Sequence, residues 1–495
     1  MSFTYRDPIH GMIKVSDEEG KIIDTPAFQR LRYIRQLGTS YLVYHGAEHT
    51  RFGHSIGVMD LVGRAMDVLE QKQPEELPKK EYKKLRQLAR IAALLHDIGH
   101  APFSHVGESD GIFPIIEDYD GEKTTGHEIY SRLIVKKYFK DVIESNFPDI
   151  LIEDVLSLMK GNITNSKYFF VKDLISSQID MDRMDYLLRD SHYCGVKYGL
   201  YDLSRLLDTL TICEPQKGVW QLGIVSNGVQ AIEEFIFARY WMFIQVYFHK
   251  TRRIFDYFLI EFLKEYLQGG KYPIDLDEYI KYNDNKILEK IHNSDIKWAK
   301  YLYTRYHLKE VFLSKPHQQD ISEEEYGIEL NDYHKLGWIY KQFKNSFPLS
   351  EEPDKYYIDQ AKTASAKELI EIKTNLDEVA EVDCCEEEAS NKRLFAIPVK
   401  DKHSAQIKPI QEYSLPIKNL SNRKINIIRI YASGLKDDKN NCTYYDKAKQ
   451  FCDNIDVRWQ NYVEEDKVRK EKFLEMQKEM EAKKQEHKNY EAKFK

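Results

Sequence analysis

Three histidines and one aspartate lie within ten residues of one another in the segment 92–105, AALLHDIGHAPFSH. The segment begins as an apolar helix, runs into the adjacent pair His96 and Asp97, is broken by glycine and proline, and carries His100 and His105. Imidazole nitrogens and carboxylate oxygens are ligands for Zn, Mn, Fe or Mg. The segment therefore predicts one part of a divalent metal site, whose remaining ligands must come from other elements.

Two other segments offer the missing ligands. His54 lies in the first turn of a predicted helix, directly after the basic Arg51. Three aspartates crowd the segment 179–186, and of these Asp182 and Asp185 share one helix face at a spacing of three residues. A solvated acidic face is the alternative interpretation, and for a single aspartate it is about twice as common as ligation. The methionines and leucines of the same helix favour burial of part of it.

Apolar residues at helical spacing predict most of the elements that position these groups. Helices are expected at about 27–37, 51–71, 81–96, 127–139, 149–160, 168–190 and 228–267. A β-hairpin is expected at 209–226, where two alternating segments flank a Glu-Pro-Gln-Lys-Gly turn. Residues 393–432 alternate in strand fashion, and residues 466–495 are so rich in charge that they predict a solvated helix or a frayed tail.

The predicted fold class is mostly α: a helical core with a small β-hairpin, a smaller α+β C-terminal lobe and a charged helical tail. We expect the core at 1–270, a helical extension with acidic loops at 271–392, the α+β lobe at 393–460 and a charged helical or disordered tail at 461–495. A chain of 495 residues is long enough for this arrangement.

Composition excludes several classes of protein. The net charge of −7 argues against a protein that coats nucleic acid non-specifically, although a local basic pocket is compatible with it. No apolar run approaches the roughly 18–20 residues that span a bilayer, and the N-terminus has no signal-peptide apolar region. The six cysteines show no CxxC spacing, so we expect reduced thiols in a cytoplasmic protein that does not bind membranes.

The order of the ligand segments carries a resemblance. Arg51-Phe-Gly-His54, His96-Asp97 and Asp182 resemble the H…HD…D pattern of HD-superfamily metal-dependent phosphohydrolases. Four segments are similar to the dNTP triphosphohydrolases of that superfamily, both the vertebrate SAM-and-HD-domain enzymes and their bacterial dGTPase-like relatives. These segments are DPIHG (7–11), IDTPAFQRLRYIRQLG (23–38), LHDIGHAPFSH (95–105) and IDMDRMDYLLRD (179–190). The resemblance covers roughly residues 5–255, and we expect no N-terminal SAM domain because the HD part starts almost at Met1.

The resemblance implies a metal-dependent enzyme with an HD core that cleaves dNTP to deoxynucleoside and triphosphate. It implies that His54, His96, Asp97 and Asp182 bind a divalent ion, which is Mn, Mg, Fe or Zn. It also implies a catalytic group of His127, Glu108 and His100, in which Glu108 replaces the family's aspartate and adds one methylene.

The same resemblance implies a set of substrate contacts. Phosphate oxygens are expected at Arg51, Arg183 and Arg239, where Arg183 replaces a family lysine and keeps its charge. The sugar is expected at Asp190, Tyr186, Tyr247, Gln36 and Leu37, which leave no room for a 2′-hydroxyl. His105 is assigned to the substrate side, with a structural role as its equal alternative. Taken singly, each arginine would be a surface ion-pair residue and each tyrosine a core residue, so the ordered combination carries the assignment.

A nucleotide effector, GTP or dNTP, is implied at subunit interfaces of a homo-oligomer, a dimer or a tetramer. Its matching positions are Asp24, Gln29, Arg32, Val43, Tyr44, Arg205, His249 and Lys250. The match is incomplete, because Phe3 and Arg6 stand where the family has lysine and asparagine contacts. The alternative is that Asp24 only caps a helix and that Arg32 is only a surface charge.

Two other functions compete with the dNTPase hypothesis. One is an HD nuclease or phosphodiesterase acting on single-stranded nucleic acid or on a signalling nucleotide, which the negative net charge disfavours. The other is a non-enzymatic nucleotide sensor that uses the charged tail for docking, which the intact ligand set disfavours. A dNTPase would serve either homeostasis of the dNTP pool or antiviral and antiphage defence, and the sequence does not decide between them.

Overall fold

The computed structural model describes residues 3–72, 77–108, 111–162, 165, 168–315, 317–319, 332–347, 349–362, 397–404, 406–421, 423–436, 442–469 and 472. The chain divides into two compact units, Met1–His307 with Ala364–Arg423, and Leu308–Thr363 with Lys424–Lys495. Of the predicted features, the acidic stretches 322–326 and 377–388 and the cysteines 384 and 385 lie outside the described residues.

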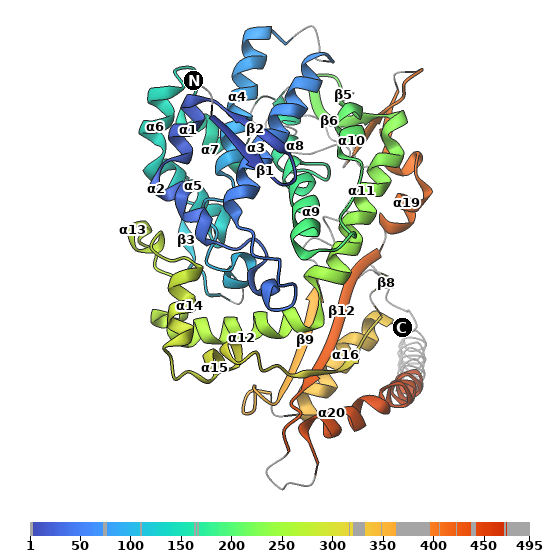
Figure 1. The fold of residues 1–495 in the computed structure, drawn as a ribbon. Helices are drawn as coiled ribbons and strands as arrows, with labels where there is room; N and C mark the ends of the chain where they lie inside the picture. The colour runs from blue at the N-terminus through green and yellow to red at the C-terminus, as the bar shows by residue number, and fades with distance from the viewer. Residues whose placement is uncertain are drawn as a thin grey trace, which may run out of the picture. The chain divides into compact units, whose positions relative to one another are not determined.

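The first unit is mostly helical, which confirms the predicted fold class. Its core helices are α3 (Arg51–Glu70), α4 (Lys79–Leu95), α5 (His127–Tyr138), α8 (Phe169–Ile175), α9 (Met181–Cys194), α11 (Val229–Met242) and α12 (Lys250–Tyr266). Helix α3 packs between α4 and α9, and Figure 1 shows the three side by side. The predicted apolar face of α3, including Val58, Leu61, Val62 and Leu69, is fully buried. The metal-ligand segments are thus carried by three helices that share one core.

Shorter elements surround these helices. They are β1 (Phe3–Asp7), β2 (Gly11–Val15), α1 (Asp17–Ile23), α2 (Pro26–Gln29), η1 (Arg30–Tyr33), η2 (Gly38–Leu42), η3 (Ser104–Glu108), β3 (Ile116–Glu117), β4 (Lys123–Thr124), α6 (Lys140–Asn146), α7 (Ile152–Lys160), α10 (Leu203–Thr209), η5 (Ser226–Gly228), η6 (Phe243–Tyr247), η7 (Gln268–Gly270), α13 (Leu276–Tyr279), α14 (Asp284–His292) and α15 (Lys297–Tyr303). Strands β1 and β2 form an antiparallel hairpin, from the pair Phe3 and Val15 to the pair Asp7 and Gly11.

The predicted helix 27–37 is wrong in its second half. Thr25 caps α2 by accepting a hydrogen bond from the backbone N–H of Phe28, and the helix then tightens into η1. Ile34 is extended, and its carbonyl accepts from the backbone N–H of Arg51, while the N–H of Gln36 donates to the carbonyl of His49. This pairing with residues 49–51 replaces the helical hydrogen bonds, so tertiary contact overrides the helical pattern.

Two other predicted helices are interrupted. The segment 168–190 breaks before α9, because the carboxylate of Asp180 caps that helix and also accepts from the N–H of Ser177. The segment 228–267 breaks at η6, a π-helical turn, and restarts at α12, where the His249 side chain accepts from the N–H of Thr251. Such turns re-aim side chains within a helix and are frequent at functional sites.

The predicted β-hairpin is present as β5 (Leu210–Gln216) and β6 (Val219–Val225), which pair antiparallel. Strand β10 (Pro398–Lys400) adds to β6 in parallel, and β11 (Ile407–Pro409) pairs with β10, giving the order β11-β10-β6-β5. After β11, η9 (Ile410–Glu412) and α19 (Leu415–Ser421) complete this part of the first unit. Residues 398–409, which fall in the predicted α+β lobe, thus extend the sheet of the hairpin.

The second unit is a small α+β body. Strand β12 (Arg423–Ala432) pairs antiparallel with β7 (Lys309–Leu313) and β9 (Tyr356–Lys362), and β8 (His317–Gln319) belongs to the same sheet. Helices α16 (Asp332–Ser346) and α20 (Tyr444–Asp453) supply one side of its core, in which Ile339, Phe343 and Ile430 are buried. Residues 455–469 are also helical, and the rest of the predicted tail, apart from residue 472, lies outside the described residues.

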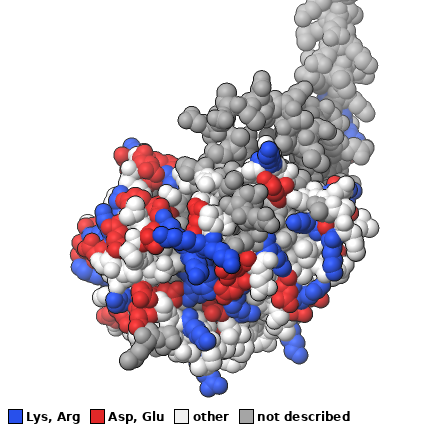
Figure 2. All heavy atoms as spheres, turned by 90° about the horizontal axis from the view of Figure 1, so that it is seen from above, with Lys and Arg blue, Asp and Glu red and all other residues white. Residues whose placement is uncertain are grey.

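The distribution of charged side chains on the surface and the polarity of the helices agree with the high content of charged residues. Figure 2 shows acidic and basic side chains interspersed over one face, with a compact group of Lys and Arg near its centre. Among the described helices, none combines the length and apolarity that a bilayer crossing requires. Of the cysteines that the structure describes, Cys194, Cys213, Cys442 and Cys452 are free thiols.

Candidate active site

The four predicted metal ligands meet at one point in the first unit. His54 comes from the first turn of α3, His96 caps the end of α4, Asp97 follows it, and Asp182 comes from the first turn of α9. Nε2 of His54 lies 3.0 Å from Oδ1 of Asp182 and 3.4 Å from Oδ2 of Asp97. Nε2 of His96 lies 3.3 Å from Oδ1 of Asp97 and 3.7 Å from Oδ1 of Asp182. Three helices therefore bring two imidazoles and two carboxylates together.

The hydrogen bonds of the two imidazoles fit a metal ion. Nδ1 of His54 lies 2.7 Å from Oδ2 of Asp185, and Nδ1 of His96 lies 2.7 Å from the carbonyl oxygen of Ala93. Both Nε2 atoms are buried and have no hydrogen-bond partner in the described structure. When the imidazoles are neutral and each Nδ1 donates to its oxygen, each Nε2 carries the lone pair that a metal ion would accept. Two neutral imidazoles and two carboxylates suit an Mn, Fe, Mg or Zn ion.

Without an ion, the ligands of the cluster shift one another's pKa values. Burial lowers the pKa of His54, but the carboxylates of Asp182 and Asp185 outweigh it and raise that pKa to about 10. Burial raises the pKa of Asp182, and the two imidazoles outweigh it, so the pKa lies below the ordinary value. Burial also raises the pKa of Asp97, but the nearby charges, mainly that of Arg51, outweigh burial and hold this pKa well below its usual range. Perturbed ionisation in a buried group of ligands is typical of a functional site.

A second layer of buried charges holds His54 in place. The carboxylate of Asp185 accepts from Arg189, whose Nε and Nη2 both lie at 2.8 Å, and its Oδ1 lies 2.6 Å from Nε2 of His10. Arg189 also donates to Asp7 at 2.9 Å, and Asp7 accepts from the backbone N–H of His10 at 3.0 Å. Gly57 is needed here, because a Cβ on α3 would collide with Asp185 and Arg189. The hairpin β1–β2 is thereby tied to the metal cluster.

Sequence reasoning missed this layer. The sequence predicts the segment DPIHG as a turn that also belongs to the resemblance, and it assigns no role to Asp7 or His10. The spacing of Asp185 and Arg189, four residues apart on one helix, was the available signal of an ion pair. The three aspartates of α9 in fact have three different tasks: Asp180 caps the helix, Asp182 faces the metal cluster and Asp185 orients His54.

A second cluster adjoins the first. Both oxygens of Glu108 are used, one by Nδ1 of His100 and the other by Nδ1 of His127, which lies 2.7 Å away. The rings of His100 and His127 stack with centroids 3.8 Å apart. Nε2 of His100 lies 3.2 Å from Oδ1 of Asp97, so the two clusters meet at that carboxylate. His105 is exposed, with Nδ1 3.5 Å from Glu108. The predicted catalytic residues are thus brought together beside the predicted metal ligands.

The carboxyl group of Glu108 is ionised. Burial raises the pKa of its carboxyl, but His100 and His127 outweigh burial and hold that pKa well below the usual range. The glutamate is therefore an ionised acceptor that fixes the orientation of both rings.

The break after α4 gives His100 its direction. The N–H of Gly99 donates to Oγ of Ser131 on α5 at 2.9 Å, and a Cβ at Gly99 would collide with that helix. Phe103 and Ser104 then adopt positive φ angles of 60° and 54°, which are strained for residues with side chains. The N–H of Phe103 is held by Oδ1 of Asp284 at 2.8 Å. Tertiary contacts from α5 and α14 thus maintain the turn.

The predicted phosphate-contacting arginines lie around these clusters and are engaged with local acceptors. Arg51 is buried, pairs with Asp97 and donates to Oγ of Ser104 at 2.8 Å. Arg183 pairs with Asp180 on its own helix, and Arg239 donates to the side chain of Gln178 at 3.3 Å. Of the three, only Arg51 contacts a metal-cluster residue directly among the bonds described.

The predicted sugar-contacting residues are assembled around Asp190. This carboxylate lies 2.8 Å from Nε2 of His49 and accepts from the hydroxyl of Tyr247 at 2.7 Å. Tyr247 also meets Tyr186 edge to face, with ring centroids 6.3 Å apart. Gln36 is buried and hydrogen-bonds by its backbone to residue 49, and its side-chain Oε1 has no partner in the described structure. Leu37, next to Gln36, is also buried. His49 is a member that sequence reasoning missed.

The predicted effector residues fall into three places in the first unit. Asp24 is exposed at the end of α1, near Gln29 and Arg32, and Arg32 donates to the Gln29 side chain at 2.8 Å. Tyr44 meets the ring of His249 at 5.8 Å, where η2 packs on α12, with Val43 beside Tyr44 and Lys250 beside His249. Arg205 lies apart in α10 and donates to the carbonyl of Asn227. Several of these residues cap helices or form hydrogen bonds on the surface, so they also have structural roles.

Two family models match the chain: the HD domain over residues 51–190 and the HD associated region over residues 201–326. The first match contains the whole metal cluster, from His54 to Asp182. An uncharacterised protein of Methanocaldococcus jannaschii is 31% identical over 366 residues, which make up 71% of this chain and 71% of that protein. The chain belongs to the HD-domain family.

Other proteins are similar to this chain over half of its length or more. The uncharacterised protein YwfO of Bacillus subtilis is 40% identical over 52% of this chain, which spans 54% of that protein. The deoxynucleoside triphosphate triphosphohydrolase SAMHD1 of Gallus gallus is 29% identical over 71% of this chain and 61% of that protein. A crystal structure of a hypothetical protein from Aquifex aeolicus matches 91% of this HD chain with a TM-score of 0.66 at 26% identity.

Proposed function

We propose that this HD-family chain is a metal-dependent phosphohydrolase that cleaves dNTP into deoxynucleoside and triphosphate. The observation that supports this most is the contact between its two clusters. His100 lies 3.2 Å from Asp97 and shares Glu108 with His127, so a proton-transfer group stands directly beside a metal-ligand group. Similarity to a triphosphohydrolase of Gallus gallus supports the choice of substrate.

The residues divide the chemistry between them. A divalent ion held by His54, His96, Asp97 and Asp182 would supply Lewis acidity toward the phosphate and a water of lowered pKa. Water attacks the α-phosphorus, the bond to the 5′-oxygen breaks, and that oxygen takes up a proton as the deoxynucleoside leaves. His127 is oriented by Glu108 to provide this proton, and such a positioned group contributes roughly 10²–10⁴-fold in rate.

The triphosphate and the sugar have separate contacts in this proposal. Arg51, Arg183 and Arg239 lie around the clusters and carry the positive charge that phosphate oxygens require. We assign the 3′-hydroxyl to the carboxylate of Asp190, which already accepts from the hydroxyl of Tyr247. Packing of Tyr247 against Tyr186 closes the same region, which supports exclusion of a 2′-hydroxyl and hence a preference for dNTP over NTP.

Nucleotide effectors and assembly into a homo-oligomer belong to the same proposal. The exposed Asp24 and Arg32 and the half-buried Gln29 would read a nucleobase, since the carboxylate accepts from base N–H groups.

Product analysis tests the proposed function. The full-length protein is incubated with Mn or Mg and each dNTP, singly and mixed, and products are separated by ion-exchange chromatography. Triphosphate and deoxynucleoside are expected, and the His96→Ala, Asp97→Ala double variant should give neither. Activity only in the mixture would reveal an effector requirement. Monophosphates, shortened strands of single-stranded DNA, or undiminished turnover by the double variant would overturn the proposal.

A further inference from the structure

A cavity of about 1000 Å³ opens outside the catalytic clusters, between β2, α3 and the first half of α4. It is large enough for a ligand of nucleotide size. Its lining residues are His10, Met12, Lys14, Val15, Ser16, Glu19, Asp60, Gly63, Arg64, Asp67, Glu70, Tyr82, Lys83, Arg86, Gln87 and Arg90. None of them is among the residues assigned above to metal, substrate or effector.

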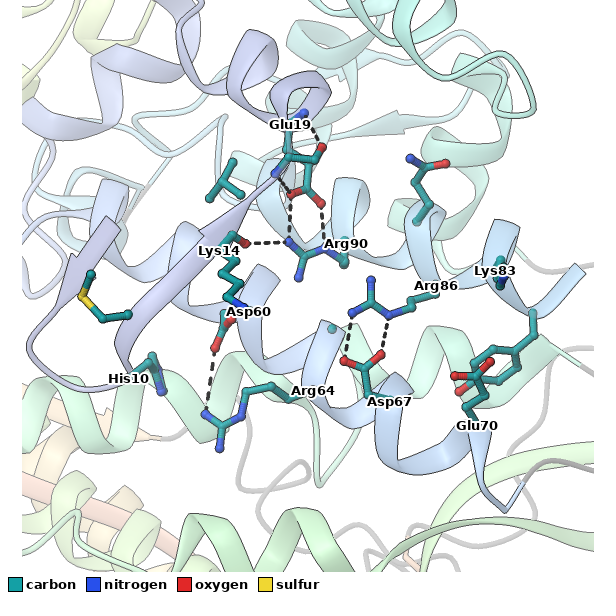
Figure 3. A pocket seen from close by; sticks show the side chains of 16 residues that line it. His10, Lys14, Glu19, Asp60, Arg64, Asp67, Glu70, Lys83, Arg86 and Arg90 are labelled. Atoms are coloured by element: carbon teal, nitrogen blue, oxygen red, sulfur yellow. Dashed lines mark hydrogen bonds and ion pairs between the residues drawn. The ribbon is translucent and has the colours of Figure 1, made fainter. Parts of the chain in front are cut away.

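Four of the nine lysine, arginine, aspartate and glutamate side chains that line the cavity neutralise one another in two pairs. Arg90 pairs with Glu19 through two bonds of 2.6 and 2.8 Å, and Arg86 pairs with Asp67 through bonds of 2.7 and 3.0 Å. Figure 3 shows both pairs as two-pronged contacts that stand side by side on the wall. Because these four side chains bind one another, a ligand would contact the other charged side chains of the wall.

The remaining charges on the wall are mostly positive. Lys14 on β2 and Lys83 on α4 are exposed and form no ion pair with a described residue. Arg64 on α3 is only 3.9 Å from Asp60, at the limit of an ion pair. Outside the two strong pairs the wall thus carries three cations from three elements, Lys14, Arg64 and Lys83, against the two carboxylates of Asp60 and Glu70.

The start of α4 has a charge pattern that opposes its own stability. Lys79, Lys80, Lys83 and Lys84 fall in the first two turns, and the N-cap Pro78 offers no side-chain hydrogen bond. Cations at this end are unfavourable, because the helix dipole is positive there and the first N–H groups lack partners. Only Lys84 is relieved, by Asp154 at 3.2 Å. Of these four lysines, Lys83 lines the cavity, and Glu81 in the first turn offsets part of their charge.

We propose that this cavity binds a diphosphate-containing anion, whose phosphate oxygens contact Lys14, Arg64 and Lys83. A diphosphate matches the site because it spreads several negative oxygens over a length that can meet cations on separate elements. The group would come either from inorganic pyrophosphate or from a nucleoside diphosphate. The residues proposed to contact the phosphate oxygens, Lys14, Arg64 and Lys83, take no part in the proposed dNTP hydrolysis.

His10 gives such a site a route to the catalytic centre. Its side chain lines the cavity and its Nε2 lies 2.6 Å from Asp185, whose other oxygen lies 2.7 Å from Nδ1 of His54. Nδ1 of His10 is buried and has no hydrogen-bond partner among the described residues. One imidazole and one carboxylate thus separate the anion site from a metal ligand.

Calorimetric titration of the full-length protein tests the proposal without turnover. Inorganic pyrophosphate and ADP are titrated in the presence of EDTA into the wild type, a Lys14→Glu, Lys83→Glu variant and a Lys123→Glu, Lys217→Glu control. The control reverses two exposed lysines elsewhere, so the net charge changes equally. We expect the cavity variant to bind at least about tenfold more weakly and the control to differ little. ADP tighter than pyrophosphate would identify the nucleotide as the source. Equal losses in both variants, an unchanged cavity variant, or binding of neither anion would overturn the proposal.

Hydrogen exchange locates the bound anion. Protection by pyrophosphate is expected in peptides that cover residues 10–16 and 79–90. Protection confined to residues 96–108 and 127–138 would place the anion at the catalytic clusters and would overturn the cavity assignment. Both measurements are independent of hydrolysis, so loss of the proposed function would leave this test intact.

Discussion

Oδ2 of Asp185 lies 2.7 Å from Nδ1 of His54, and this contact decides which nitrogen of the metal ligand is free. The carboxylate is itself fixed by Arg189 and His10, both of which are buried. A ligand carried by the first turn of a helix is thus oriented by a strand hairpin more than forty residues away in sequence.

Asp185→Asn should weaken metal binding by about 10–100-fold, as loss of such an orienting partner usually does. The amide supplies one acceptor oxygen where Arg189, His10 and His54 now use two. The measurement is Mn affinity by titration, with thermal unfolding followed in parallel. Arg86→Gln is a matched control, because it also removes one member of a carboxylate–arginine pair but lies outside this network. Unchanged Mn affinity in Asp185→Asn would show that His54 is oriented without it.

Metal binding should release protons and strengthen with pH. Asp182 and Asp185 overcome the effect of burial and raise the pKa of His54 to about 10, so the metal-free chain carries a protonated imidazole at neutral pH. A metal must displace that proton, so affinity should rise about tenfold per pH unit between 6 and 8. Because the folded pKa is raised, protonated His54 stabilises the metal-free fold fully below about 6.5, and this contribution is lost as pH rises through about 10. Calorimetry in buffers of different ionisation enthalpy counts the released protons, and a pH-independent affinity would contradict the prediction.

Glu108→Gln should reduce kcat by roughly 10²–10³-fold while metal content stays at the wild-type level. The neutral amide would place an N–H group against one of the two imidazoles and would remove the charge that orients them. Glu108→Asp keeps the charge and should recover part of the loss. Metal analysis and steady-state kinetics of the three proteins check this. Equal kcat values in the Gln and Asp variants would indicate that charge at this position is unimportant.

Asp284→Asn should lower both activity and the free energy of unfolding, the latter by about 1–3 kcal/mol. The carboxylate accepts from the backbone N–H groups of Phe103 and Arg35, at 2.8 and 3.0 Å, and an amide can accept only one of them. The strained turn at Phe103 and Ser104 would lose its anchor. Urea unfolding and product formation measure the two effects, and wild-type values for both would remove Asp284 from this role.

The same residue predicts a pH dependence of stability. Burial, opposed by bonds from Phe103 and Arg35, raises the pKa of Asp284 to about 6 from an ordinary value of 3.8. The folded chain therefore holds this proton more tightly than the unfolded chain. Its contribution to the free energy of unfolding should fall as pH rises from about 4 to about 6. Asp284→Asn should lack this fall when unfolding is measured across that range, and an identical slope in both proteins would contradict the assignment.

The sequence by itself determined the ligand types and the elements that carry them. The cluster of histidines and Asp97 after an apolar helix predicts part of a metal site, and the resemblance to the H…HD…D pattern adds His54 and Asp182. Alternation around a turn predicts the hairpin at 209–226. Helical spacing of apolar residues located both α3 and α4, although α3 is buried on most of its sides because it packs between α4 and α9.

Tertiary structure alone decided how those ligands are held. His10 reaches Asp185 across 175 residues, and Asp284 reaches Phe103 across 181. Neither contact leaves a local pattern, because a single hydrogen bond between distant segments imposes no periodicity on either one. The predicted helix 27–37 was wrong in its second half for the same reason. The backbone groups of Ile34 and Gln36 form hydrogen bonds with residues 49–51 instead of continuing a helix. Spacing within a helix can be read from the sequence, but pairing between elements requires the fold.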